Sequence, residues 1–200
     1  MNIDLQNQNL LGIYIKPEAA VVVGSSQGEE GPQTGLFRVS LADYEPSEEE
    51  SAEEGFEPSL AQLVRMIAGE CRERKLNTGG VYVALDSRLF MQHRVRSKFT
   101  EFRQIAQTIR FDTEEVLATD IASVGIAFNI LASDSEGSDL TVFTAQRNDL
   151  ADIIIPLQKA GLDPVSIEPD VLCLARVVCR SSFYREGDFY CIFSRDRAYF

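Results

Sequence analysis

The segment Thr141–Arg176 constrains the fold most, because it reads as a strand, a helix, a second strand and a second helix in quick succession. An apolar β-rich run leads into a helical pattern that ends at Gly161. Pro164–Ile167 then has the pattern of a short strand, and Pro169 with Asp170 begins another helix. Strands alternating with helices predict an α/β protein with mixed sheets flanked by helices, rather than a helical bundle or a β-barrel.

The rest of the chain has the same mixture of elements. Three β-hairpins are predicted, each followed by a helical pattern. The hairpins are Leu10–Val23, Val81–Val95 and Val124–Ala145, and the helices are capped or begin at Ser59, Thr100 and Asn148. Within the second helical region, Asp112–Glu115 is interpreted as a break followed by a new helix start. Gly24–Gly35 is interpreted as a polar loop, and Phe189–Phe193 as a strand that restarts the hairpin-then-helix order.

An acidic segment interrupts this pattern at Tyr44–Pro58. It holds seven glutamates, so it cannot bury much surface and is predicted to be a disordered or mobile loop. Two interpretations stay open for it: a solvated insertion, or a docking loop for a basic partner.

The overall charge restricts the partners. A formal charge of −12 disfavours nucleic acid, which needs basic patches against its phosphates, and disfavours direct attachment to an anionic membrane. The first residues, MNIDLQNQNLLG, have no features of a signal peptide, and no run of about 20 apolar residues occurs. We therefore expect an intracellular protein that associates with a membrane only through partners or through a segment outside this chain.

Metal and cofactor chemistry has little support. The histidine His93 stands alone, and Cys71, Cys173, Cys179 and Cys191 form no CxxC pair, so no zinc site is expected. Each cysteine lies in an apolar stretch, which predicts buried free thiols in a reducing compartment. No P-loop, GxGxxG or EF-hand pattern is present, and we expect no catalytic residue and no cofactor.

Charged residues near the middle of the chain are candidates for a partner-facing surface. Glu114, Glu115 and Asp120 form an acidic group, but adjacent helical residues do not share a face, so acid–base catalysis is disfavoured. A solvated or dipole-capping role and a partner-facing role both stay open. The same choice, solvated face or docking face for an acidic protein, applies to the basic cluster Arg94, Arg96, Lys98, Arg103 and Arg110.

Two stretches of the chain resemble the GspL and PilM assembly proteins. Arg103–Phe128 is similar to a GspL segment, with matches at Arg103, Phe111, Glu114, Glu115, Leu117 and Asp120. Thr141–Arg176 is similar to the "AGL-x-P" and "PD-x-l-a-L" segment of both proteins, at Ala160, Gly161, Leu162, Pro164, Pro169, Asp170, Leu172 and Leu174. The resemblance implies an actin-like ATPase (ribonuclease H-like) fold, with residues 1–186 as its first half and 187–200 as the start of a second subdomain. The fold is then expected to be incomplete at the C-terminus.

The resemblance also locates the two phosphate hairpins of that fold. An acid and a glycine are usual in the first, where Tyr14 and Lys16 stand here, with Pro17 removing a donor amide. The second is usually "D-I-G" and here has Ile192 and Ser194 at its ends. These four degenerate positions argue against ATP hydrolysis.

The family then implies a non-catalytic cytoplasmic scaffold at the inner face of the inner membrane. Its expected partners are the AAA+ ATPase of a type II secretion or type IV pilus machine and inner-membrane assembly proteins, and a homodimer is also allowed. The partner-facing candidates are Arg103, Glu114, Glu115 and Asp120. Two alternatives remain: a PilM-like protein that binds ATP at a site completed beyond residue 200, and a generic α/β regulatory domain.

Overall fold

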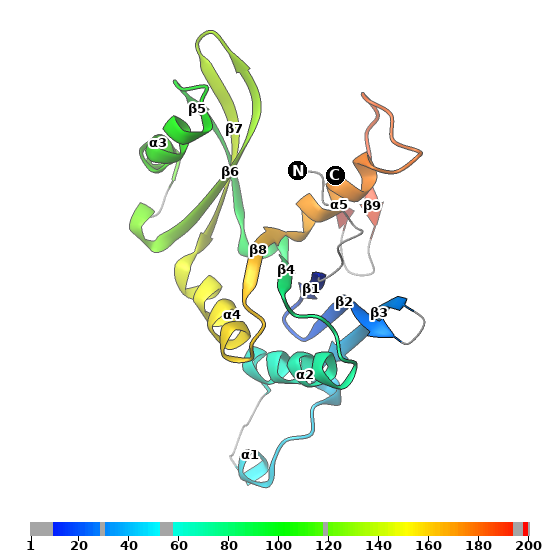
Figure 1. Ribbon diagram of the computed structural model, residues 1–200. Helices are drawn as coiled ribbons and strands as arrows, with labels where there is room; N and C mark the ends of the chain where they lie inside the picture. The colour runs from blue at the N-terminus through cyan, green and yellow to red at the C-terminus, as the bar shows by residue number, and fades with distance from the viewer. Residues whose placement is uncertain (1–9, 29–30, 53–57, 118–119, 194–197, 200) are drawn as a thin grey trace.

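The computed structural model describes residues 10–28, 31–52, 58–117, 120–193 and 198–199 (Figure 1). Its largest part is a five-stranded sheet in the order β3-β2-β1-β4-β8. These strands are β1 (Leu10–Ile15), β2 (Ala19–Gly28), β3 (Gly31–Ser40), β4 (Gly80–Leu85) and β8 (Pro164–Pro169). β1, β4 and β8 run parallel, whereas β2 and β3 are antiparallel to their neighbours.

A smaller sheet of three strands has the order β5-β7-β6 and is antiparallel throughout. Its strands are β5 (Met91–Ser97), β6 (Val124–Asp134) and β7 (Gly137–Gln146). The register of β6 against β7 shifts between Ile130 and Ala132, where β6 carries one extra residue. A two-stranded pair, β9 (Ile192–Phe193) and β10 (Ala198–Tyr199), lies near the end of the chain.

The helices are distributed over both sheets (Figure 1). They are α1 (Glu48–Ala52), α2 (Leu60–Glu73), α3 (Phe102–Glu114), α4 (Arg147–Lys159) and α5 (Asp170–Cys179). α2 and α4 pack together on one side of the larger sheet, and α3 packs against β5 of the smaller sheet. Among the described residues, no helix combines the length and the apolar composition that crossing a bilayer requires.

Two hydrophobic cores hold these layers together. The larger lies between the five-stranded sheet and helices α2 and α4, and Leu63, Ile67 and Leu85 are fully buried in it. Full burial of a side chain of this size contributes about 1.5–3 kcal/mol. α2 starts as predicted at Ser59, through a capping box with Gln62. The smaller core consists of Val95, Ile105, Ile109, Leu140 and Val142.

The predicted first and third hairpins are confirmed, but the predicted hairpin Val81–Val95 is wrong. β4 lies in the five-stranded sheet between two parallel neighbours, while β5 pairs with β7 in the smaller sheet. Asp86 caps a short 3-10 helix, η2 (Ser87–Leu89), that directs the chain from one sheet to the other. Local spacing detects two strands and a turn but not the strand with which each one pairs.

The polar stretch Gly24–Gly35 is not a loop over its described residues. β2 continues through it to Gly28 and β3 begins at Gly31, so that Ser25 pairs with Thr34. Backbone hydrogen bonds form the ladder here, and they do not require apolar side chains.

The helix break predicted at Asp112–Glu115 is also wrong, because α3 continues to Glu114. Thr113 is fully buried on the same side of the helix as Ile105 and Ile109, and its hydroxyl donates to the Ile109 carbonyl at 2.5 Å. Its polar atom is thereby satisfied inside the helix.

The acidic segment is helical at α1, so the predicted loop is wrong there; residues 53–57 lie outside the described residues. The Glu50 carboxylate accepts hydrogen bonds from the Tyr44 hydroxyl at 2.6 Å and from the Ser47 amide at 3.0 Å. Gln62 of α2 donates to it at 3.3 Å. Glutamate composition predicts solvation, but this one glutamate attaches the segment to α2.

Smaller differences concern element ends. Asn148 does not cap α4, whose N-cap is Gln146, and Pro169 ends β8 and caps α5 rather than being its first residue. Gly161 has the positive φ of 79° that was predicted for the end of α4. The strand predicted at Phe189–Phe193 is limited to its last two residues.

Candidate functional site

The carboxyl ends of the three parallel strands meet at one edge of the larger sheet. Ile15 of β1 is in register with Leu85 of β4, which is in register with Pro169 of β8. The residues that follow these positions therefore lie side by side, at the edge where open α/β sheets commonly bind ligands.

Asp170 occupies the centre of this edge and is only 4% exposed. Its carboxylate accepts a hydrogen bond from the Tyr14 hydroxyl at 2.8 Å and one from the Ser87 amide at 3.1 Å. The Ser87 hydroxyl also donates to it. One buried charge thus connects β1, the turn after β4 and the start of α5, where the positive end of the helix dipole favours an anion.

A second buried carboxylate, Asp86, lies beside it and is 3% exposed. It accepts from the Arg88 amide at 3.0 Å and from the Arg88 guanidinium at 2.7 Å. Within the described part of the chain, no group of three or more Cys, His, Asp or Glu residues is arranged to hold a metal ion.

The sequence predictions for the phosphate positions are met to different extents. Tyr14 is half-buried at this edge, and the Lys16 ammonium lies 5.6 Å from its ring centroid. Ile192 lies in β9 and is half-buried, whereas Ser194 lies outside the described residues. The sequence singled out Tyr14 but not its bond to Asp170, because Asp170 reads as an ordinary helix start.

The predicted partner-facing residues lie elsewhere, on and after α3. Arg103, Glu114 and Glu115 are exposed on this helix. Asp120 is exposed too and caps the short helix η3 (Ile121–Ser123), accepting from the Ala122 amide at 2.9 Å.

The predicted basic cluster is not a single free face. The Arg96 guanidinium pairs with Asp134 at 2.6 Å and with Asp139 at 3.2 Å. Arg110 donates to the carbonyls of Ile121 and Val124 at 3.3 and 3.4 Å, so it fixes the start of β6.

The histidine and the cysteines have structural surroundings. The His93 imidazole is half-buried, with Nε2 3.1 Å from the Thr144 hydroxyl. Cys71 is buried as predicted, and burial raises its pKa to about 11. The prediction of burial is wrong for Cys179 and Cys191, which are exposed.

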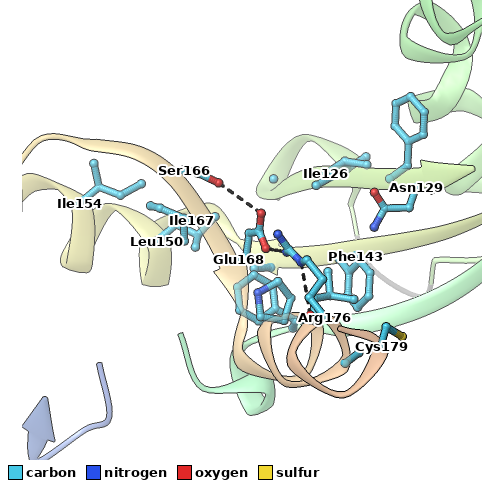
Figure 2. A pocket seen from close by; sticks show the side chains of 18 residues that line it. Ile126, Asn129, Phe143, Leu150, Ile154, Ser166, Ile167, Glu168, Arg176 and Cys179 are labelled. Carbon is cyan, nitrogen blue, oxygen red and sulfur yellow. Dashed lines mark hydrogen bonds and ion pairs between the residues drawn. The ribbon is translucent and has the colours of Figure 1, made fainter. Parts of the chain in front are cut away.

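A groove of about 840 Å³ separates the two sheets (Figure 2). One wall is β6 from Gly125 to Asn129, and the other is β8 from Ser166 to Pro169 together with α5. Each of these strands is the outermost strand of its sheet. Two sheet edges, each paired on one side among the described strands, therefore face the same groove.

The lining is largely apolar, with one charged pair at its centre. Phe90, Phe143, Leu150, Ile154 and Ile167 supply most of the apolar surface.

Figure 2 shows the Glu168 carboxylate and the Arg176 guanidinium in contact, and they form an ion pair. The Ser166 hydroxyl lies 3.5 Å from Glu168. The sequence did not indicate this groove, because its walls lie about 40 residues apart along the chain; the single available signal was the open-edge position of β6, which follows only from knowing the sheet order.

Comparisons with known proteins agree with this architecture. The family "Type II secretion system (T2SS), protein L" matches residues 74–196, which is more than half of the chain. A search of curated proteins finds no match.

Two solved structures share the fold. A chain of the "PilM-PilN type IV pilus biogenesis complex" aligns with a TM-score of 0.64 and 22% identity, over 86% of this chain and 51% of that one. The cytoplasmic domain of EpsL, an inner-membrane component of the type II secretion system of Vibrio cholerae, aligns with a TM-score of 0.51 and 18% identity, over 82% of this chain and 58% of that one. Both neighbours have actin-like folds, and the present chain spans about half the length of each.

The actin-like fold predicted from the sequence is thereby confirmed. The match over residues 74–196 covers the segments on which the resemblance to GspL and PilM was based. The chain belongs to the type II secretion system protein L family, and it is an assembly component of the GspL and PilM kind.

Proposed function

We propose that this chain is a non-catalytic scaffold of a type II secretion or type IV pilus machine, which connects the assembly ATPase to inner-membrane components. The observation that carries the proposal is the groove between β6 and β8, because two open strand edges border a largely apolar channel. Such an edge can take an extended segment of another protein as an added strand, with backbone hydrogen bonds giving affinity and side-chain pockets giving specificity.

The groove also offers a charged anchor for such a segment. Glu168 and Arg176 lie partly exposed, at 31% and 51% of their side-chain areas, so a bound segment can exchange ion-pair partners with them. The neighbouring PilM chain was solved in a complex with PilN, another pilus protein, which supports an assembly partner rather than a small molecule as the ligand. Localisation at the inner face of the inner membrane would then follow from the partners.

The non-catalytic part of the proposal rests on the carboxyl edge. Where the fold usually has an acid that helps to hold a metal–nucleotide complex, the Tyr14 hydroxyl instead donates to Asp170 at 2.8 Å. Arg88 neutralises the other buried carboxylate, Asp86. Both carboxylates therefore already have positive or donor partners.

An arginine placed in the groove tests the scaffold function. Ala127 is exposed in the middle of β6 and lines the groove, so Ala127→Arg fills it without disturbing a core. The matched control is Ala122→Arg, at an exposed alanine of η3 outside the groove. We expect co-purification of the secretion ATPase or of an inner-membrane assembly protein of the same machine to be lost with Ala127→Arg and kept with Ala122→Arg. Equal binding by both variants would refute the groove as the docking site.

A second function, nucleotide binding, is favoured by one observation: Asp86 and Asp170 lie side by side, both almost fully buried, at the strand ends. Titration calorimetry of the full chain with ATP and Mg²⁺ separates the two functions. The scaffold proposal expects no binding at micromolar concentrations, and micromolar affinity would overturn its non-catalytic part.

A further inference from the structure

Helix α3 has one buried side and one exposed side. Ile105, Ile109 and Thr113 face the smaller sheet. On the opposite side, Phe111 is 71% exposed, an unusual exposure for a phenylalanine in a helix that already has a core to pack against. α3 also lies at the margin of the molecule in Figure 1, where other described elements leave this side uncovered.

The charges on the exposed side are arranged at its two ends. Arg103 lies in the first turn and Glu114 is the last residue, eleven positions later. Eleven residues are almost three full turns, so both side chains lie within about 20° of one another around the helix and about 16 Å apart along it. They are too distant to pair with each other, and among the described residues neither has an ion-pair partner.

We propose that this side of α3 binds a second copy of the chain, with the two helices antiparallel about a two-fold axis. A cation and an anion at opposite ends of one stripe complement themselves when the stripe is reversed. Arg103 then faces the partner's Glu114, and Glu114 faces the partner's Arg103, as an isologous interface requires.

The position of the axis follows from the two charged pairs. It crosses α3 midway between them, near Thr108, and Phe111 lies about 4 Å from it along the helix. The two symmetry-related Phe111 rings fall on the same side of the axis and close enough to pack together. The interface thus has an apolar centre between two ion pairs, which accounts for the exposure of Phe111.

The contact is small. A 13-residue helix is about 20 Å long, so the pair buries less than the roughly 1,600 Å² of a standard interface. Each copy also carries a formal charge of −12, which opposes association. The dimer is therefore weak, with a dissociation constant on the order of 0.1 mM. The inference is independent of the groove and of the nucleotide position.

Sedimentation equilibrium of the full chain, from about 10 µM to 1 mM, tests the dimer. Arg103→Glu or Glu114→Arg alone places like charges opposite each other at both ends and should weaken dimerisation about tenfold. The double variant exchanges the charges and should restore the wild-type constant to within about threefold. Phe111→Ser should weaken the dimer by a similar factor to a single reversal.

Glu115→Arg is the matched control. It changes the net charge as Glu114→Arg does, but Glu115 lies about 100° further around the helix and should leave the dimer intact or tighten it slightly. All these side chains are exposed, and far-UV circular dichroism verifies folding. A wild-type chain that is monomeric at 1 mM, or a double variant as weak as the single ones, overturns the proposal. So does loss of secretion-ATPase binding in these variants without any dimer, because it assigns the face to a different protein.

Discussion

Replacing Tyr14 by phenylalanine removes one hydroxyl and tests how much the carboxyl-edge cluster stabilises the fold. The lost hydrogen bond, 2.8 Å long, ends on a carboxylate that is 4% exposed. Hydrogen bonds to charged groups contribute about 1.5–3 kcal/mol. Asp170 keeps the Ser87 amide and hydroxyl as donors, so its charge is not left unpaired, and the lower end applies. We expect a loss of about 1.5 kcal/mol in the free energy of unfolding.

Urea unfolding followed by circular dichroism measures this loss, as a lower midpoint at unchanged slope. For a chain of this size, the same loss lowers Tm by about 3–6 °C. Tyr82 supplies the matched control, because it lies on the neighbouring strand β4 and has no side-chain hydrogen bond among the described residues. Tyr82→Phe should therefore be close to neutral. If Tyr14→Phe and Tyr82→Phe agree within about 0.3 kcal/mol, the cluster does not contribute as argued.

Three further results are expected. Hydrogen bonds, chiefly from a tyrosine hydroxyl, lower the pKa of Glu50 from 4.5 to about 2, so its contribution to stability is complete at neutral pH and is lost as the pH falls from about 4.5 to 2; the Tm difference between wild type and Glu50→Gln should close over that range and stay constant above it. Gly69→Ala, in α2 with open space for the new methyl group, should stabilise by about 0.5–1 kcal/mol, whereas Gly137→Ala, at φ 142° with a carbonyl oxygen 2.0 Å from the added carbon, should destabilise by more than about 3 kcal/mol; a similar response of both in thermal unfolding would contradict the backbone argument. A thiol reagent at pH 8 should modify Cys179 rapidly and Cys71 only on unfolding, and mass spectrometry showing early labelling of Cys71 would contradict its burial.

The sequence was most informative where a local rule determines the structure. Ser59 with Gln62 specifies the start of α2, and Gly161 specifies the end of α4, because capping depends on residues only a few positions apart. The first hairpin was predictable for the same reason, since Pro17 lies in its turn.

The sequence was least informative about pairing between distant segments. Nothing local shows that β4 and β5 belong to different sheets, or that β8 joins β4 from about 80 residues further along. The groove and the Tyr14–Asp170 bond both depend on that long-range arrangement, so they could not be predicted. The α3 charges were noticed from the sequence, but their common face became apparent only when α3 proved to be one continuous helix.

The extra residue in β6 limits what the groove can hold. An added strand follows β6 in regular register only from Val124, whose carbonyl Arg110 and Arg147 hold in place, to Ile130, where the irregularity begins. That span admits about seven residues, or roughly 24 Å of extended chain. A ligand segment must therefore be short and must leave the groove after two turns' worth of alternating side chains. Because a slip of one residue would exchange its inward and outward side chains, such a ligand would be recognised by the phase of its sequence as much as by its composition.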